Sequence, residues 1–454
     1  MERTQDVGRR QVVSAGIASV MGWGMDLYDL MIILYVASTI GPLLVPAGST
    51  TLQLAFVYAS FAVTLIMRPA GSAVFGSFAD RNGRKKAMLV AITGVGVSTA
   101  LMGLVPTYAV AGVAAPLLFV LLRLVQGVFV GGVVASTHTL GTETVGPRHR
   151  GLMSGLVSGG GAGVGAVLAS TVFFVVSSLF PGEAFTTVGW RVMFLSGLLA
   201  AALSFFVYRR TEESPLWAGK DEQAGPRASR SPLRTLFSPS YRPIFLVNLV
   251  LVTGGASLYY LTVGFFPTFF DTTIGLPKTT AAAVLIVINL AVVLGGVLGG
   301  MLSDRIGRRR TFLALGIPTL LIVCPLYLLT STLTGDDVAL VLLLCAIMGL
   351  LMMTATAPIM IFLNERFPTA IRATGTGMSW NAGYALGGMT PTVVTLLSPE
   401  VADIPSRVTA VFAVMAVLFL LGAAIAPETA GRDLRAVDAP GEQPVGPSAE
   451  HQPS

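Results

Sequence analysis

The sequence predicts an all-α membrane protein with twelve transmembrane helices arranged in two six-helix bundles. Of its 454 residues, 53% are hydrophobic and only 11% are charged, whereas soluble domains carry charge on about 25% of their residues. Twelve long apolar runs follow one another along the chain, and one basic loop motif recurs at matching places in its two halves. These observations exclude an ordinary soluble protein and a chain that is disordered over most of its length.

The apolar runs each reach or approach the length of about 20 residues that a helix needs to cross a bilayer. They lie at 12–37, 53–75, 87–107, 113–137, 152–180, 190–208, 244–270, 279–302, 311–332, 338–363, 373–397 and 407–426. We therefore expect each run to form one membrane span.

The basic residues indicate how these spans are oriented. Of the 29 Lys and Arg residues, 24 fall in the termini and in the loops of one side, whereas the other side holds only Arg191, Lys278 and Arg407. Because positive charge gathers on the cytoplasmic side, both termini are expected in the cytoplasm and the protein in the plasma (inner) membrane. The positive net charge thus indicates topology and does not indicate nucleic-acid binding.

The positions of the spans divide the chain into five parts. Two Pro-containing polar stretches separate or follow the bundles, and the second of these has the composition of a disordered tail. The expected parts are a cytoplasmic N-terminus (1–11), a first bundle (12–208), a cytoplasmic linker (209–243), a second bundle (244–426) and the tail (427–454).

A loop motif is present in both halves. Residues 76–86 read GSFADRNGRKK and follow the second span, and residues 300–310 read GMLSDRIGRRR and follow the second span of the second half. Glycines permit a tight turn, an Asp is favoured near a helix N-terminus, and arginines bridge carboxylates of neighbouring helices. Together with a second pair of matching loops, the motif predicts a cytoplasmic gate formed by Gly76, Asp80, Arg81, Gly83, Arg84, Glu143, Arg150, Asp304, Arg305, Gly307, Arg308, Glu365 and Arg372.

With these motifs, the sequence resembles the major facilitator superfamily over residues 10–430. Within it, the chain resembles the metabolite:proton symporters and the sialate and carboxylate symporters at three places, which are residues 26–29 (DLYD), 67–71 (MRPAG) and 123–127 (RLVQG). Asp26 and Leu27 replace the Glu and Trp of these symporters, and aromatic-acid symporters with a similar first span are an alternative. The resemblance implies alternating access, with the substrate bound between the two halves.

Two acidic residues lie within the first span. Asp26 and Asp29 are three positions apart and therefore share one helix face. An ionised carboxylate costs about 2.5–3.5 kcal/mol at the bilayer centre, so these two residues need a proton or a cationic partner. Arg123, about ten residues inside the fourth span, is the expected partner. We predict proton coupling by Asp26, Asp29 and Arg123, without choosing between the two aspartates; the alternative is an Asp that only caps or kinks the helix.

A second group of residues is expected to bind substrate. Arg68 lies inside the second span, where its guanidinium suits a substrate carboxylate, although its side chain could instead reach the membrane surface. The second half offers only polar and aromatic groups within its spans, for which helix packing is the alternative role. The predicted substrate-binding residues are Tyr28, Arg68, Gln126, Tyr259, Tyr260, Asn289, Trp380, Asn381 and Tyr384.

These features predict a secondary active transporter and not an enzyme. We expect proton-coupled uptake of a small organic anion, a carboxylate-type metabolite, by a monomer in the lipid bilayer, with no cofactor, no metal and no nucleic acid. A proton-antiport exporter is one alternative. A channel or a receptor without transport activity is another.

Overall fold

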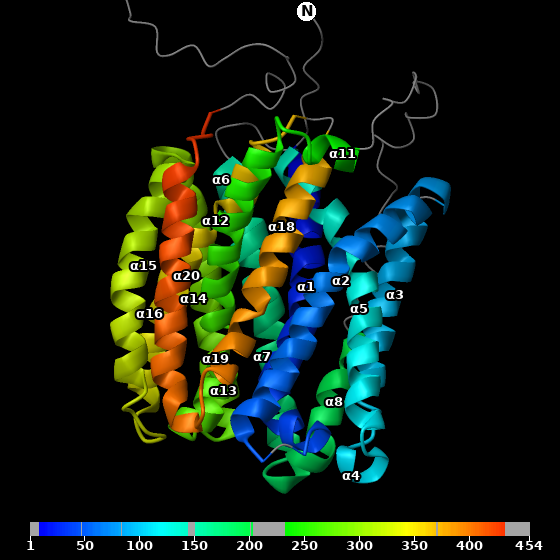
Figure 1. Cartoon of the computed structure of the whole chain (residues 1–454), viewed down its shortest axis with the longest axis vertical. Helices are drawn as coiled ribbons and strands as arrows, with labels where there is room; N and C mark the ends of the chain where they lie inside the picture. Colours follow the sequence, from blue (N-terminus) through cyan, green and yellow to red (C-terminus); the bar gives the residue numbers. More distant parts are fainter. Residues whose placement is uncertain are drawn as a thin grey trace, which may run out of the picture.

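A computed structural model describes residues 9–46, 48–82, 84–143, 150–199, 201–202, 232–368 and 371–431, and within these ranges every regular element is a helix (Figure 1). Most of the predicted linker and all of the tail beyond residue 431 lie outside the described residues. The helices run along the long axis of the molecule, as expected for a bundle that crosses a membrane.

The first half provides the first six predicted spans. The fifth span is continuous from α6 through a π-helical turn, η2, into α7, and the sixth begins with a second π-helical turn, η3. The elements are α1 (Arg9–Leu44), α2 (Thr50–Asn82), α3 (Arg84–Met102), the short α4 (Tyr108–Ala111), α5 (Ala114–Glu143), α6 (Arg150–Gly155), η2 (Leu156–Gly160), α7 (Gly161–Leu179), η3 (Phe185–Gly189) and α8 (Trp190–Leu195).

The second half of the chain provides the remaining six predicted spans. Its seventh, tenth and eleventh spans are each interrupted by a short break. The elements are α11 (Pro232–Leu236), α12 (Arg242–Leu261), α13 (Phe266–Phe269), η4 (Phe270–Ile274), α14 (Lys278–Ile306), α15 (Arg308–Thr330), α16 (Val338–Thr356), α17 (Ile359–Asn364), α18 (Arg372–Gly388), α19 (Thr390–Leu396), η5 (Val401–Asp403) and α20 (Ile404–Ile425). Within the described residues every predicted span coincides with helix, which confirms the predicted fold class, and positions 200 and 203–208 of the sixth span lie outside them.

The outer surface of the bundle is apolar. Nine helical segments of the described residues are long and apolar enough to cross a membrane, and two shorter apolar helices, Leu89–Met102 and Phe185–Leu199, add to them. Large apolar side chains such as Leu321 and Val414 are more than 60% exposed. A soluble protein rarely exposes such a surface, whereas lipid solvates it.

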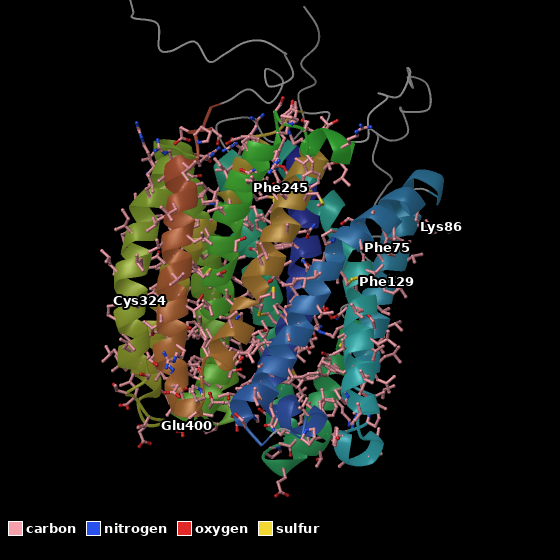
Figure 2. The ribbon with its side chains drawn as sticks, in the orientation of Figure 1. Phe75, Lys86, Phe129, Phe245, Cys324 and Glu400 are labelled. Carbon is pink, nitrogen blue, oxygen red and sulfur yellow. The ribbon has the colours of Figure 1, made fainter. Side chains whose placement is uncertain are left out.

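The two ends of the bundle differ in charge. Helix α1 begins and α20 ends at the upper end of Figure 1, which we call the basic end because Arg308 and Arg309 open α15 there. The lower end, which we call the opposite end, holds α4, and Figure 2 places Glu400 there. Within the first half, Figure 2 shows Phe75 of α2 beside Phe129 of α5, with ring centroids 5.7 Å apart.

Glycines bring the two halves into backbone contact. A Cβ atom on Gly155 would lie 2.1 Å from the carbonyl oxygen of Gly296, and one on Gly159 would lie 2.4 Å from the Gly296 Cα atom. Side chains larger than hydrogen would therefore separate the fifth span from α14. This close approach places η2 and its Ser158 at the interface of the halves.

Candidate functional site

A small cavity with a volume of about 20 Å³, enough for about one water molecule, lies between the two halves. Helices α1, α7, α12, α16, α17 and α18 and the turn η2 contribute to its wall. The lining residues are Trp23, Leu27, Ser158, Ala162, Tyr259, Met353, Thr356, Ile359, Trp380 and Tyr384. Since both halves supply residues, a molecule bound here would contact both at once.

Aromatic rings form much of the cavity wall. Trp380 and Tyr384 stack with their centroids 4.2 Å apart, and Trp23 meets their rings edge-on at 5.7 and 6.5 Å. The hydroxyl groups of Tyr259 and Tyr260 are buried and have no hydrogen-bond partner within the described part of the chain. Buried polar groups are almost always bonded, and of these two residues Tyr259 lines the cavity, so its hydroxyl is available to a molecule bound there.

Arg68 and Asp26 form a buried ion pair beside this cavity. The guanidinium donates from Nη1 to Oδ2 and from Nη2 to Oδ1 of Asp26, both at 3.0 Å, and the exposed fractions of the two residues are 1% and 6%. Tyr260 and Tyr384 lie close enough to interact electrostatically with both Arg68 and Asp26. The arginine predicted to bind a substrate carboxylate therefore holds a carboxylate of the chain itself.

Asp29 is held by a different set of residues. Its carboxylate accepts hydrogen bonds from the Thr99 hydroxyl and from Nε2 of Gln126. Gln126 Oε1 in turn accepts a hydrogen bond from Nη1 of Arg123 at 2.5 Å. Among the described residues no cation pairs directly with Asp29, so the predicted Arg–Asp contact in this region is made by Arg68 with Asp26, and Arg123 reaches Asp29 only through an amide.

Besides Arg68, five residues predicted to bind substrate do not line the cavity, and these are Tyr28, Gln126, Tyr260, Asn289 and Asn381. Tyr28 bonds to Ser196 at 2.6 Å, Gln126 bridges Asp29 and Arg123, and Asn289 donates to Tyr35 and Ser170. The sequence reasoning missed Trp23 and Thr99. Trp23 precedes Asp26 by three positions and so shares its helix face, which was a usable signal; nothing local marks Thr99.

Contacts between the halves close the cavity at the opposite end. The hydroxyls of Tyr58 and Thr268 are 2.7 Å apart, and the ring of Tyr58 stacks on Phe265. Thr268 lies in α13, directly after the break that separates α12 from α13.

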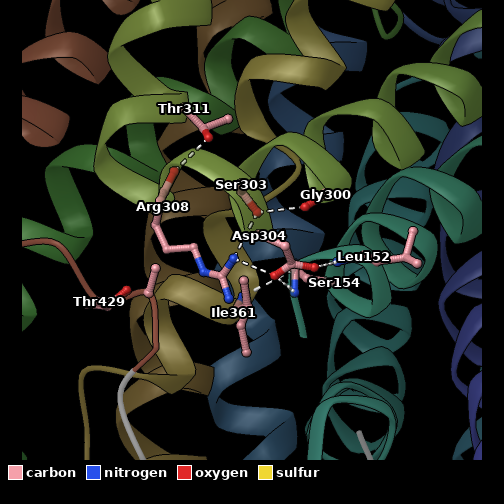
Figure 3. A network of polar contacts seen from close by, with 12 residues as sticks. Leu152, Ser154, Gly300, Ser303, Asp304, Arg308, Thr311, Ile361 and Thr429 are labelled. Atoms are coloured by element: carbon pink, nitrogen blue, oxygen red, sulfur yellow. Dashed lines mark hydrogen bonds and ion pairs between the residues drawn. The ribbon is translucent and has the colours of Figure 1, made fainter. Parts of the chain in front are cut away.

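At the basic end, a polar network closes the other side (Figure 3). Asp304 accepts hydrogen bonds from the backbone N–H groups of Gly151 and Leu152, both at 2.8 Å, at the start of α6 in the other half. A carboxylate is favoured at a helix N-terminus, where N–H groups are unpaired. Arg308 ties Asp304 to Glu365 with ion pairs of 2.8 and 3.1 Å. The conformation is thus occluded at both ends.

Carboxylates hold the remainder of this network in place. The Thr429 hydroxyl donates to Glu365 at 2.6 Å, and Glu428 accepts hydrogen bonds from the backbone N–H groups of Arg308 and Arg309. Burial raises the pKa of Glu365, and Arg308 opposes that rise. Removing Arg308 would leave the buried carboxylate of Glu365 without this cation, whereas Arg308 would keep its ion pair with Asp304 if Glu365 were removed.

The predicted gate residues are only partly covered by the structure. Of the second copy, Asp304, Gly307, Arg308 and Glu365 take part in the network or contact it, whereas Arg305 is exposed and Arg372 donates to the carbonyl oxygen of Phe367. Arg150 is buried at the start of α6. The side chains of the first copy lie outside the described residues; these are Gly76, Asp80, Arg81, Gly83, Arg84 and Glu143.

Gly307 is predicted to be essential for the stability of this end. Its φ of 99° is one that other residues rarely adopt, and a Cβ atom there would lie 2.4 Å from the Glu428 carboxylate. Gly307→Ala should therefore cost about 1–3 kcal/mol and lower the unfolding temperature measured in detergent. Gly377→Ala, at a helical site with open space, is the control; an equal loss of stability in both variants would contradict the prediction.

Two helical bundles with a cavity between them, and contacts between the bundles at both ends, are the architecture of a class of membrane transporters. The chain matches the Major Facilitator Superfamily over residues 12–391 and belongs to this family. It is therefore a multi-pass integral membrane transport protein and not an enzyme.

Several characterised proteins are similar to the chain over most of its length. The "Inner membrane metabolite transport protein YhjE" of Escherichia coli is 32% identical, covering 82% of this chain and 84% of that protein. The "Ectoine/proline transporter ProP" of Corynebacterium glutamicum is 30% identical, covering 84% and 77%. The structure of the proton:xylose symporter XylE superposes with a TM-score of 0.73 at 19% identity, covering 94% and 98%, which shows a shared fold.

Proposed function

We propose that this transporter takes up a small carboxylate-bearing metabolite, an organic anion or a zwitterion, together with a proton. The observation that carries the proposal is the buried Arg68–Asp26 pair beside the aromatic cavity. Arg68 already holds one carboxylate through two parallel hydrogen bonds, so a substrate carboxylate can take the place of Asp26 with the same geometry.

The aromatic wall and the relatives together favour substrates that also carry a positive nitrogen. The faces of Trp23, Trp380 and Tyr384 suit a cation, an interaction worth about 0.5–2 kcal/mol. The similar proteins include transporters named for ectoine, proline and betaine, three compounds that share a carboxylate and a cationic nitrogen. In a conformation in which the cavity is wider, the carboxylate would lie near Arg68 and the cationic end among these rings.

Asp29 is the proposed proton site. Its partners in the described chain, Thr99 and Gln126, are neutral, in contrast to Asp26, which is neutralised by Arg68. A buried carboxylate without a direct cation is expensive inside a membrane, and a proton removes that cost. Asp26 and Asp29 thus have separate roles, one toward the substrate and one toward the proton.

The closures at the two ends provide the alternating gates. We infer that substrate and proton enter when the Tyr58–Thr268 contact is open, and that they leave when Asp304 separates from α6. The occluded conformation lies between these states. The bundles 12–208 and 244–426 would move as rigid bodies around the cavity, and the basic end would face the cytoplasm with both termini, in an inner membrane and as a monomer.

Uptake into proteoliposomes tests this function. Purified protein would be offered labelled L-proline, glycine betaine, ectoine, benzoate, citrate and xylose under an imposed inward proton gradient. We expect accumulation of at least one carboxylate-bearing compound, alkalinisation of the external medium, and abolition of both by a protonophore. The methyl ester of the accepted compound should not be accumulated.

Other results would identify another function. Gradient-driven loss of the compound from loaded vesicles would indicate a proton-antiport exporter. Downhill flux that never exceeds equilibrium would indicate a channel. Accumulation of xylose alone, or of the methyl ester as readily as the acid, would contradict the role assigned to Arg68.

A further inference from the structure

Gln126 lies between the proposed proton site and a buried cation. Its Nε2 donates to Asp29 and, at 2.8 Å, to the Thr99 hydroxyl, while its Oε1 accepts from Arg123 at 2.5 Å. The side chain of Gln126 is fully buried. No other described side chain is hydrogen-bonded to both Asp29 and Arg123.

The guanidinium of Arg123 is held mainly by its hydrogen bond to the amide of Gln126. Its Nε and Nη2 atoms are buried and have no hydrogen-bond partner within the described ranges, so the bond to Gln126 is the one such bond that its guanidinium makes there. The ring of Phe61, whose centroid is 5.9 Å from the guanidinium carbon, provides a further cation–π contact. Because the guanidinium of Arg123 has so few partners, loss of the hydrogen bond to Gln126 would leave it free to move.

The charges on both sides fix the orientation of the amide. An ionised carboxylate only accepts hydrogen bonds, and a guanidinium only donates them. With Asp29 ionised, the amide must therefore point its NH₂ group at Asp29 and its oxygen at Arg123, which is the observed arrangement. The charged groups that act on Asp29 are Arg123, Asp26 and Arg68, and among the described side chains α3 contributes the neutral Thr99.

Protonation of Asp29 changes this requirement. A proton taken from water makes Asp29 a neutral acid whose O–H can donate to the amide oxygen of Gln126. If the amide of Gln126 turns over to accept that bond, its NH₂ group faces Arg123. A guanidinium cannot accept a hydrogen bond, so the hydrogen bond between Gln126 and Arg123 is lost. The new O–H bond on Asp29 forms as one O–H bond of a hydronium ion breaks and leaves water, and no other covalent bond changes.

We propose that Gln126 is a positioning residue that transmits the protonation state of Asp29 to Arg123 by turning over its amide group. This proposal rests on the proposed proton coupling at Asp29. Ionised Asp29 holds Arg123 through the amide, and protonated Asp29 releases it. The released guanidinium is the charge whose movement would connect proton binding to rearrangement of the first half.

Substitutions at Gln126 and Thr99 separate this relay from simple packing around Asp29. Gln126→Leu keeps the volume but removes both hydrogen bonds, and Gln126→Glu keeps an acceptor for Arg123 but offers Asp29 no amide. Thr99→Val is the matched variant, because Thr99 also bonds Asp29 but does not contact Arg123. The probes are labelled L-proline and glycine betaine in proteoliposomes.

We expect both Gln126 variants to lose proton-driven accumulation by about tenfold or more, while counterflow at equal pH on both sides stays within about threefold of the parent. Thr99→Val should shift the pH at which accumulation is half-maximal but retain accumulation. Normal accumulation by Gln126→Leu would overturn the proposal, and so would equal losses in Gln126→Leu and Thr99→Val.

An infrared titration of the substrate-free protein keeps this test independent of the transport function. In the parent protein, the carboxyl band that Asp29→Asn removes should titrate together with a change in the guanidinium bands of Arg123. In Gln126→Leu the carboxyl band should titrate while the guanidinium bands stay constant. Guanidinium bands that still respond in Gln126→Leu would refute the relay, whereas failure of the parent to accumulate any compound against a proton gradient would refute only the proposed function.

Discussion

Replacing Asp29 by Asn is expected to lower proton-driven accumulation by about a hundredfold while exchange of substrate across the membrane continues. Asn has the same shape and can keep hydrogen bonds to Thr99 and Gln126, so the fold around the site should persist. It cannot gain or lose a proton, so the gradient no longer drives the cycle. Uptake driven by a pH gradient and counterflow at equal pH, measured on the same proteoliposomes, separate the two effects.

Asp336→Asn is the control for this experiment. Asp336 is exposed in the loop at the opposite end, between α15 and α16, and its loss should leave accumulation unchanged. If Asp29→Asn accumulated substrate normally, Asp29 would not be the proton site. If it lost exchange as completely as accumulation, its role would be in substrate binding or in the fold.

The second large effect is expected at Arg68. Arg68→Gln removes the proposed substrate anchor and leaves the carboxylate of Asp26 buried without its cation. Breaking a buried pair in this way costs about 3–5 kcal/mol, so the single variant should unfold at a lower temperature and should not transport. Arg68→Lys should also transport poorly, because an ammonium group cannot hold a carboxylate through two parallel bonds.

A double variant separates stability from binding. Arg68→Gln combined with Asp26→Asn has no unpaired charge, so the unfolding temperature should recover while uptake stays about a hundredfold below the parent. Lys278→Gln, which breaks a partly exposed ion pair with Asp271, is the control and should keep uptake. Transport by the double variant at the parental rate would show that substrate does not bind to Arg68.

The apolar runs and the doubled loop predicted the architecture well. A span must be about 20 residues long and apolar whatever its neighbours are, so its presence and approximate bounds can be read from the sequence alone. The charged residues inside the spans can also be identified from the sequence alone. Asp26, Asp29, Arg68 and Arg123 stand out because the cost of burying them is independent of the fold, and all four are buried in the first half.

The partners of those charges could not be predicted in this way. Sequence spacing places Asp26 and Asp29 on one face of α1, but the rotation of α1 against α2 and α5 decides which arginine each of them meets. That rotation is set by packing over the whole helix length, including glycines such as Gly24, whose Cβ would lie 3.2 Å from the backbone of Gly161. Reasoning from the sequence therefore paired Arg123 with an aspartate and left Arg68 to the substrate.

The amino-acid sequence by itself determined the class of protein, the number of its spans and the identity of its costly charges, because each follows from local composition and length. Only the tertiary structure decided that Arg68 holds Asp26, that an amide stands between Arg123 and Asp29, and that Trp23 and Trp380 share one cavity. These contacts join residues of different helices, and their geometry depends on how twelve helices pack together.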